Sequence, residues 1–264
     1  MLDLINVTKT FHPGTVSEKR ALTGVNLHLD NGDFVTVIGG NGAGKSTTLN
    51  AVAGTFPIDG GQILIDGVDI SRLSEHRRAK YIGRVFQDPR MGTAADMEII
   101  ENLALAARRG KRPTLCWGIS LRERAVYMQM LADFDLGLEH RMSAKAGLLS
   151  GGQRQALTLL MATLAEPKLL LLDEHTAALD PKTAAKVLSL TQRIVSEKHL
   201  TAMMVTHNMK DAITYGNKLV MMYDGHIIFE ASGDEKKALT VETLVRKFSE
   251  TSGEEFSSDR TLLS

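Results

Sequence analysis

Apolar and polar residues alternate along the first third of the chain as they do in β-strands. Apolar positions recur at every second residue over 21–29, and a shorter alternation covers residues 2–7. Both patterns are typical of strands with one buried face. Residues 34–38 (Phe-Val-Thr-Val-Ile) are almost wholly apolar, as in strands buried on both faces of a parallel sheet. Further strands are predicted over 62–65 and 81–86.

Three dipeptides typical of tight hairpin turns lie between apolar segments. They are Asn31-Gly32, Asp66-Gly67 and Asp224-Gly225. The first two predict a small antiparallel element within residues 21–67. The third predicts a hairpin between strands over 218–223 and 226–230.

Helical periodicity dominates the middle of the chain, where residues 95–165 are expected to be mainly helical. The predicted helices cover residues 46–53, 97–107, 121–134, 153–165 and 181–197. The apolar runs 169–172 and 201–205 are predicted to be core strands. This order of elements predicts an α/β sandwich with a mostly parallel sheet, into which the helical middle is inserted.

Composition limits the classes of function. The chain has 264 residues, and its 31 Lys and Arg balance its 31 Asp and Glu. We therefore expect no nucleic-acid partner, since such domains are usually basic. The single cysteine, Cys116, rules out an intrachain disulfide and suits a reducing compartment. Residues 1–7 do not resemble a signal peptide, and no apolar run approaches the ~20 residues of a membrane span. We expect a soluble chain that reaches a membrane only through a partner.

Residues 39–46 (Gly-Gly-Asn-Gly-Ala-Gly-Lys-Ser) fit the phosphate-loop pattern G-x-x-x-x-G-K-[ST]. A buried strand before the loop and a helix after it support this interpretation over a glycine-rich surface turn. Glycines let the backbone curl, so that its amides converge on a triphosphate. The residues assigned to the nucleotide are Gly39, Asn41, Gly42, Ala43, Gly44, Lys45, Ser46 and Thr47. Lys45 would reach the β- and γ-phosphates, and the Ser46 hydroxyl would ligate Mg²⁺.

Two acids, Asp173 and Glu174, end the apolar run 169–172. Adjacent carboxylates at the end of a buried strand are costly unless something uses them. Beside a phosphate loop, Asp173 is predicted to bind Mg²⁺, and Glu174 to polarise the water that attacks the γ-phosphate.

With the pentapeptide Leu149-Ser150-Gly151-Gly152-Gln153, the chain resembles the nucleotide-binding subunit of ABC transporters over nearly its full length. Further residues match the motifs of that family. Gln87 is similar to the Q-loop glutamine, which senses Mg²⁺ and the membrane partner, and Ala178-Leu179-Asp180 to the D-loop. His207 matches the switch histidine, and Phe11 lies where the family places an aromatic ring, more often tyrosine, against adenine.

The resemblance implies a P-loop NTPase (RecA-like) fold with an antiparallel β subdomain and an inserted helical subdomain. We place the ATPase domain at residues 1–248, with its core at 1–90 and 155–248 and the helical subdomain at about 91–154. Residues 249–264, rich in Ser, Glu and Thr, are predicted to form a flexible tail.

The resemblance also implies a mechanism and partners. Two copies would bury two ATP molecules, and Ser150, Gly151, Gly152 and Gln153 of each copy would face the γ-phosphate held by the other. Glu174, His207 and Lys45 would be catalytic, Ser46, Gln87 and Asp173 would serve Mg²⁺, and Asp180 would belong to the nucleotide site. Permease subunits would hold the dimer at the cytoplasmic face of the membrane, and a solute-binding protein would take part indirectly.

The docking surface for a permease is expected within residues 90–150. Its candidate residues are Met91, Met97, Ile99, Ile100 and Leu103, which could instead form the core of the helical subdomain. Trp117 could contact a partner or pack internally.

Two positions depart from the family pattern. His175 stands where proline usually follows the catalytic glutamate, and Ala177 replaces a serine near the D-loop. The strings VIGGNGAGKSTTLN and LLLLDEHTAALDPKTA resemble a bacterial subgroup that pairs with permeases similar to branched-chain amino-acid permeases. Some of its members are associated with tryptophan or related amino acids. We therefore expect an importer of amino acids or similar solutes. The alternatives are an exporter subunit, an assembly ATPase of the iron–sulfur scaffold type, and a translation ATPase, which normally has tandem domains.

Overall fold

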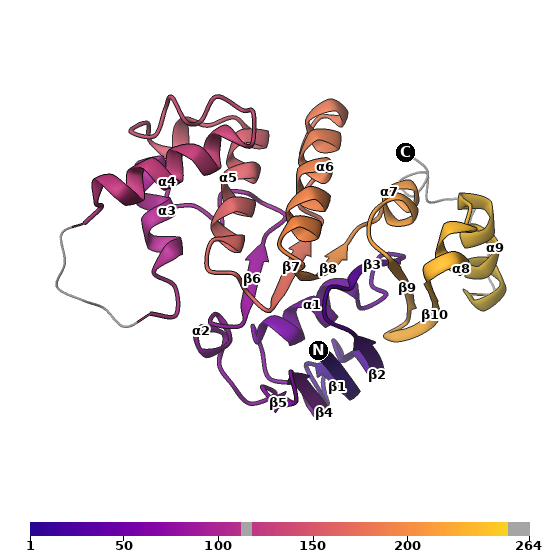
Figure 1. The fold of residues 1–264 in the computed structure, drawn as a ribbon. Helices are drawn as coiled ribbons and strands as arrows, with labels where there is room; N and C mark the ends of the chain where they lie inside the picture. The colour runs from indigo at the N-terminus through magenta and orange to yellow at the C-terminus, as the bar shows by residue number, and fades with distance from the viewer. Residues whose placement is uncertain (112–117, 253–264) are drawn as a thin grey trace. The chain divides into compact units, whose positions relative to one another are not determined.

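The computed structural model describes residues 1–111 and 118–252 (Figure 1). The chain forms two compact units, one built from residues 1–78 together with the chain from residue 199, and the other from residues 79–198. The boundaries between these units differ from the boundaries predicted between the core and the helical subdomain. The predicted domain boundaries stay a prediction. Cys116 and Trp117 lie outside the described residues.

The first unit contains a four-stranded antiparallel sheet. Its strands are β1 (Leu2–Phe11), β2 (Lys19–Leu29), β4 (Gly60–Ile65) and β5 (Val68–Asp69), in the order β2-β1-β4-β5. Ile65 pairs with Val68, which confirms the predicted hairpin at Asp66-Gly67. The antiparallel subdomain is therefore present, with β1 as one of its inner strands.

The same unit holds a second set of strands, in the order β10-β9-β3-β8. They are β3 (Phe34–Gly39), β8 (Thr201–Val205), β9 (Lys218–Tyr223) and β10 (His226–Ser232). β3 pairs in parallel with both β8 and β9, whereas β9 and β10 form the predicted hairpin at Asp224-Gly225. All six residues of β3 are buried.

The predicted hairpin at Asn31-Gly32 is wrong, because β2 and β3 belong to different sheets. Both edges of β3 are paired with parallel neighbours, so no edge is left for β2. The turn carries the chain from one sheet to the other.

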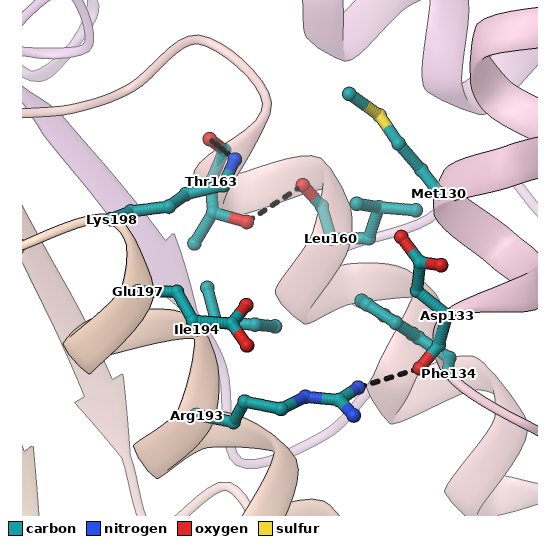
Figure 2. A pocket seen from close by; sticks show the side chains of 9 residues that line it. All are labelled: Met130, Asp133, Phe134, Leu160, Thr163, Arg193, Ile194, Glu197 and Lys198. Carbon is teal, nitrogen blue, oxygen red and sulfur yellow. Dashed lines mark hydrogen bonds between the residues drawn. The ribbon is translucent and has the colours of Figure 1, made fainter.

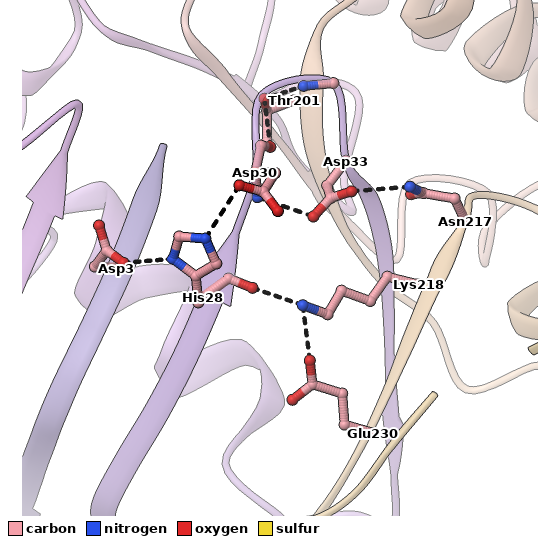
Figure 3. Close-up of polar contacts among 9 residues, drawn as sticks. Asp3, His28, Asp30, Asp33, Thr201, Asn217, Lys218 and Glu230 are labelled. Atoms are coloured by element: carbon pink, nitrogen blue, oxygen red, sulfur yellow. Dashed lines mark hydrogen bonds and ion pairs between the residues drawn. The ribbon is translucent and has the colours of Figure 1, made fainter. Parts of the chain in front are cut away.

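A polar network joins the two sheets within this unit (Figure 3). The imidazole of His28, on β2, contacts Asp3 at 2.6 Å and Asp30 at 3.2 Å. The ammonium of Lys218, on β9, donates to the His28 carbonyl oxygen at 2.7 Å and pairs with Glu230 at 2.7 Å. The end of β2 is thereby tied to β9.

Helix α1 (Lys45–Ala53) begins one residue before the predicted start and ends at the predicted residue, where Gly54 takes the left-handed conformation. A buried arginine on the short helix α2 (Glu75–Arg78) holds this end. The Arg78 guanidinium donates to the carbonyl oxygens of Ala51 at 2.7 Å and Val52 at 2.8 Å. A cation satisfies the exposed carbonyls of a helix C-terminus and complements its dipole.

Three further helices complete this unit. They are α7 (Met209–Thr214), α8 (Gly233–Lys237) and α9 (Val241–Ser252). Leu244 and Phe248 of α9 belong to a hydrophobic cluster that includes Met221 of β9 and Ala231 of β10. Figure 1 shows α8 and α9 beside β10. The predicted start of the flexible tail, at residue 249, falls inside α9.

The second unit contains a pair of parallel strands and four longer helices. The strands are β6 (Ile82–Val85) and β7 (Leu169–Asp173), and the helices are α3 (Ile99–Ala107), α4 (Leu121–Ala132), α5 (Gly151–Thr163) and α6 (Pro181–Glu197). A 3-10 turn, η1 (Ala146–Leu148), precedes α5. Helix α5 packs against α3, α6 and β6.

The candidate docking residues divide by burial. Ile99, Ile100 and Leu103 are buried and form part of the unit's core, whereas Met91 is exposed. Among the helices of residues 1–111 and 118–252, none is both long and apolar enough to cross a membrane.

Candidate nucleotide-binding site

The phosphate loop follows β3 directly in the first unit. Gly39 has φ 150° and Gly44 has φ 100°. A Cβ atom at Gly39 would collide with the carbonyl oxygen of Met222, and one at Gly44 would lie 2.7 Å from that of Ala21. Both backbone conformation and space therefore require glycine here. A glycine-rich loop that opens a helix fits the phosphates of a nucleotide.

The Lys45 side chain is buried and turns back onto the loop. Its ammonium donates to the carbonyl oxygens of Gly39 at 2.8 Å and Gly40 at 3.0 Å. Ser46, in the first turn of α1, is exposed, and Thr47 is half-buried. The cation and the hydroxyl thus both lie at the N-terminus of α1.

Phe11 ends β1 and packs edge-on against Phe56, with the ring centroids 5.2 Å apart. The Lys9 ammonium lies 5.6 Å from the Phe11 centroid and 5.5 Å from the Phe56 centroid. Sequence reasoning found neither neighbour, because Phe56 follows α1 and no local pattern links it to Phe11. The three side chains form one aromatic and cationic cluster.

His207 follows β8 and is half-buried. The next residue, Asn208, begins α7 by accepting a hydrogen bond from the Asp211 amide at 3.1 Å. Burial raises the pKa of Asp211, and the electrostatic effect of His207 opposes that rise. Asp211 is therefore an electrostatic neighbour of the predicted switch histidine that the sequence did not reveal.

In the second unit the ends of β6 and β7 bring three predicted residues together. The Gln87 amide donates to the Glu174 carboxylate at 3.2 Å. Asp173 contacts the Arg84 guanidinium at 3.5 Å, with both side chains largely buried. Arg84 was not predicted from the sequence, since one cation in a strand gives no pattern. Gln87, Asp173 and Glu174 are thus neighbours.

His175, which follows Glu174, is only 2% exposed. Its Nε2 atom lies 3.1 Å from the Thr191 hydroxyl of α6. Burial lowers the pKa of His175 to about 4, because the surrounding apolar residues disfavour the charged ring. The imidazole is therefore neutral at physiological pH.

Ser150 and Gln153 form a capping box at the start of α5. The Ser150 hydroxyl accepts from the Gln153 amide at 3.3 Å, and the Gln153 side chain accepts from the Ser150 amide at 3.2 Å. Helix α5 consequently begins at Gly151, two residues earlier than predicted. The S-x-x-Q spacing is the sequence signal that could have placed this start.

The two glycines of LSGGQ pack against the start of α6. A Cβ at Gly152 would collide with the Thr183 methyl group, and one at Gly151 would lie 3.3 Å from a Leu179 methyl group. Asp180 caps α6 by accepting a hydrogen bond from the Thr183 amide at 3.1 Å. Hydrogen bonds from Thr183 lower the pKa of the Asp180 carboxyl. The predicted signature and D-loop are therefore neighbours.

The predicted residues separate into two groups. The phosphate loop, Phe11 and His207 belong to the first unit, whereas Gln87, the LSGGQ segment, Asp173, Glu174 and Asp180 belong to the second. Ser46 and Asp173 offer the oxygen ligands that Mg²⁺ prefers, and that ion is usually held by one or two protein oxygens together with substrate phosphates. Within residues 1–111 and 118–252, no group of three or more His, Cys, Asp or Glu side chains could form a separate metal site.

A cavity of about 410 Å³ lies within the second unit (Figure 2). Phe134, Leu160 and Ile194 line it together with the charged side chains of Arg193 and Glu197. None of the predicted nucleotide residues lines it, so it is separate from the site built above.

Comparison with known proteins gives the family. A model described as "ABC transporter" matches residues 22–177, which include the phosphate loop, LSGGQ and both acids. The chain belongs to the ABC transporter family. A tyrosine transport ATP-binding protein of Clostridioides difficile (strain R20291) is 43% identical over 256 residues, covering 94% of this chain and 98% of the relative.

Solved structures of ATP-binding cassettes have the same fold. One is an ABC transporter cassette in its ADP conformation, with a TM-score of 0.77, 27% identity, and coverage of 95% of this chain and 98% of that one. Another is a dimeric cassette in a post-hydrolysis state bound to ADP and phosphate, with a TM-score of 0.73, 30% identity, and coverage of 88% and 98%. The P-loop NTPase fold is confirmed, and this ABC transporter ATP-binding subunit is an ATPase.

Proposed function

We propose that this subunit hydrolyses ATP between two copies of itself to power the import of an amino acid or a related small organic solute. The observation that carries the proposal is the 43% identity to a tyrosine transport ATP-binding protein over nearly all of both chains. Tyrosine belongs to that relative's name. For this chain it suggests an aromatic amino acid as the class of cargo.

The phosphate loop and Lys45 bind the ATP phosphates in this proposal. The Lys45 ammonium exchanges the carbonyl oxygens of Gly39 and Gly40, at 2.8 and 3.0 Å, for phosphate oxygens. Ser46 and Asp173 hold Mg²⁺, which offsets the charge on the phosphates when bound. Phe11 stacks on adenine, supported by Phe56 behind it.

Glu174 and His207 act on the hydrolytic water and the γ-phosphate. The 3.2 Å contact from Gln87 to the Glu174 carboxylate supports this role, because a positioned carboxylate can orient the attacking water. Gln87 also joins the Mg²⁺ site when the nucleotide is present, so its contact with Glu174 changes with the state of the site.

The LSGGQ segment supplies the second half of the site from the partner copy. Ser150 accepts the Gln153 amide hydrogen bond and retains its own hydroxyl proton for donation to the γ-phosphate. The N-terminus of the 13-residue helix α5 adds amides and a favourable dipole. Asp180 lies beside this segment, at the start of α6. Cleavage of the γ-phosphate removes the contact that joins the copies, and the dimer opens.

Exposed apolar side chains of the second unit support permease docking there. Leu105 of α3 is 56% exposed, and Leu121 of α4 is 87% exposed. A contiguous exposed apolar patch often marks a protein interface, and these two leucines are the candidates for such a patch in this proposal. Through such a contact the subunit works at the cytoplasmic face of the membrane, and the solute-binding protein acts on it only through the permease.

A pull-down from native membranes tests the importer proposal. We expect tagged protein, after gentle solubilisation, to retain a polytopic permease and a solute-binding protein. Leu105→Glu should lose the permease while keeping its own ATPase activity. The control is Val16→Glu, which alters an exposed apolar residue of the first unit and should retain the permease. Recovery with soluble scaffold proteins instead would favour an assembly ATPase and contradict the importer.

A further inference from the structure

Three consecutive residues at the end of β7 contact three different residues of the second unit. Asp173 pairs with Arg84, at 3.5 Å, and Glu174 contacts Gln87, at 3.2 Å. The Nε2 atom of the third, His175, lies 3.1 Å from the Thr191 hydroxyl of α6. Among the histidines of the described residues, His175 alone is buried. The proposed hydrolysis gives this imidazole no task.

The direction of the His175–Thr191 hydrogen bond follows from the neighbouring contact. The Thr191 hydroxyl donates its single proton to the Val187 carbonyl oxygen, at 2.8 Å. It therefore accepts from His175, and Nε2 carries the hydrogen. The ring is anchored to the buried face of α6 by a bond whose donor and acceptor are both fixed.

The backbone next to this anchor is strained. Glu174 has φ +41°, in the left-handed region that costs a non-glycine residue about 1 kcal/mol or more. Such a conformation persists only where its surroundings hold it. The Ala177 amide donates to the Glu174 carbonyl oxygen at 3.0 Å on one side of the turn. In addition, the His175 ring, which follows Glu174 directly, is buried and hydrogen-bonded to Thr191.

We infer that His175 is a positioning residue for Glu174. Its ring, hydrogen-bonded to Thr191, fixes the peptide that the two residues share and so keeps the Glu174 carboxylate beside Gln87. The inference rests on the proposed catalytic role of Glu174. It gives a function to a buried ring that the proposed hydrolysis does not use.

The ATPase kinetics of three threonine variants test this role. Thr191→Val removes the acceptor and should lower kcat about tenfold, because a small misplacement of a catalytic group is costly. The KM for ATP should stay within about twofold, since binding does not involve this turn. Thr191→Ser keeps the hydroxyl and should restore the wild-type kcat.

Thr163→Val is the matched control. Thr163 is also a buried helical threonine, and its hydroxyl donates to the Leu159 carbonyl oxygen at 3.0 Å. The control should lose a similar amount of stability in urea unfolding, yet keep the wild-type kcat. An equal loss of kcat in the two valine variants would overturn the inference, and so would a wild-type kcat in Thr191→Val.

His175→Phe provides the second test, because phenylalanine keeps a ring but cannot donate. It should lower kcat as Thr191→Val does, and the double variant should be no slower than His175→Phe alone. If the effects of His175→Phe and Thr191→Val on kcat multiply in the double variant, the two residues do not act through one hydrogen bond.

Glu174→Gln separates the two proposals. Wild-type turnover in that variant would overturn the role of Glu174 itself, whereas its inactivity beside fully active His175 and Thr191 variants would overturn only the positioning role.

Discussion

Lys45 and Ser150 hold hydrogen bonds within their own chain that a nucleotide would have to replace or share. The Lys45 ammonium donates to Gly39 and Gly40, and the Ser150 hydroxyl accepts from Gln153. Leaving a buried polar group without a partner costs about 1–3 kcal/mol, so the contacts of the buried Lys45 keep the phosphate loop stable without ligand. The S-x-x-Q spacing signals the contact of Ser150, but the phosphate-loop motif gives no sign of the contacts of Lys45.

Residues missed by sequence reasoning share a physical feature. Arg84 contacts Asp173 from β6, and Phe56 contacts Phe11 from the segment after α1. Their spacing from those residues along the chain follows no helical or strand period. The phosphate loop, by contrast, is local, and the backbone conformations that glycine permits at Gly39 and Gly44 follow from the sequence.

His28 gives a prediction on pH. Hydrogen bonds to Asp3 and Asp30 raise its pKa above the ordinary value of 6.5. The folded state therefore binds the proton more tightly, and the added stability is complete below pH 6.5 and is lost as pH rises through the folded pKa. The difference in melting temperature between wild type and His28→Asn should be positive at low pH and vanish as pH rises. Asp3→Asn, which removes the cross-strand acceptor, should reduce this dependence, and a difference that grows with pH would contradict the account.

Secondary structure was predictable for most elements that carry a long period of their own, although the 12-residue helix α9 was not predicted. The strands over 34–39 and 169–173 and the helix over 181–197 agree closely with the sequence pattern. Short helices such as α2 and α7 were missed, because four and six residues give too little periodicity. The turn at Asn31-Gly32 was misinterpreted because local sequence does not show which strand edges are already paired.

The packing of α5 on α6 gives a prediction for the LSGGQ segment. Gly152→Ala places a methyl group against Thr183, and the overpacking should destabilise the protein by about 1–3 kcal/mol in urea unfolding. Thr183→Ser in the same chain removes the opposing methyl group and should restore most of the loss. Gly118→Ala is the control, since an added Cβ there meets nothing within 4 Å. Wild-type stability of Gly152→Ala alone would contradict this prediction, because it would show that α5 and α6 can move apart to accept the methyl group without cost.

The reaction proposed for the whole molecule needs residues from two units and from two copies. The phosphate loop and His207 belong to one unit, and Asp173 and Glu174 belong to the other. In the proposal LSGGQ comes from a second copy. In the proposal ATP contacts all these groups. It therefore binds the assembled state more tightly than the separated one and stabilises it. The order of motifs along the sequence suggested this arrangement only through family resemblance, because no local pattern specifies a contact between copies.

The central claim, an ATP-joined dimer that hydrolysis opens, is tested most directly by light scattering on Glu174→Gln. With ATP and Mg²⁺ this variant should be a stable dimer with almost no turnover, and with ADP it should be a monomer. Adding Ser150→Asp preserves the helix cap, because aspartate caps as well as serine, but sets a negative charge against the γ-phosphate and should abolish the dimer. A Glu174→Gln chain that stays monomeric in saturating ATP, or that turns over like the wild type, would contradict the account.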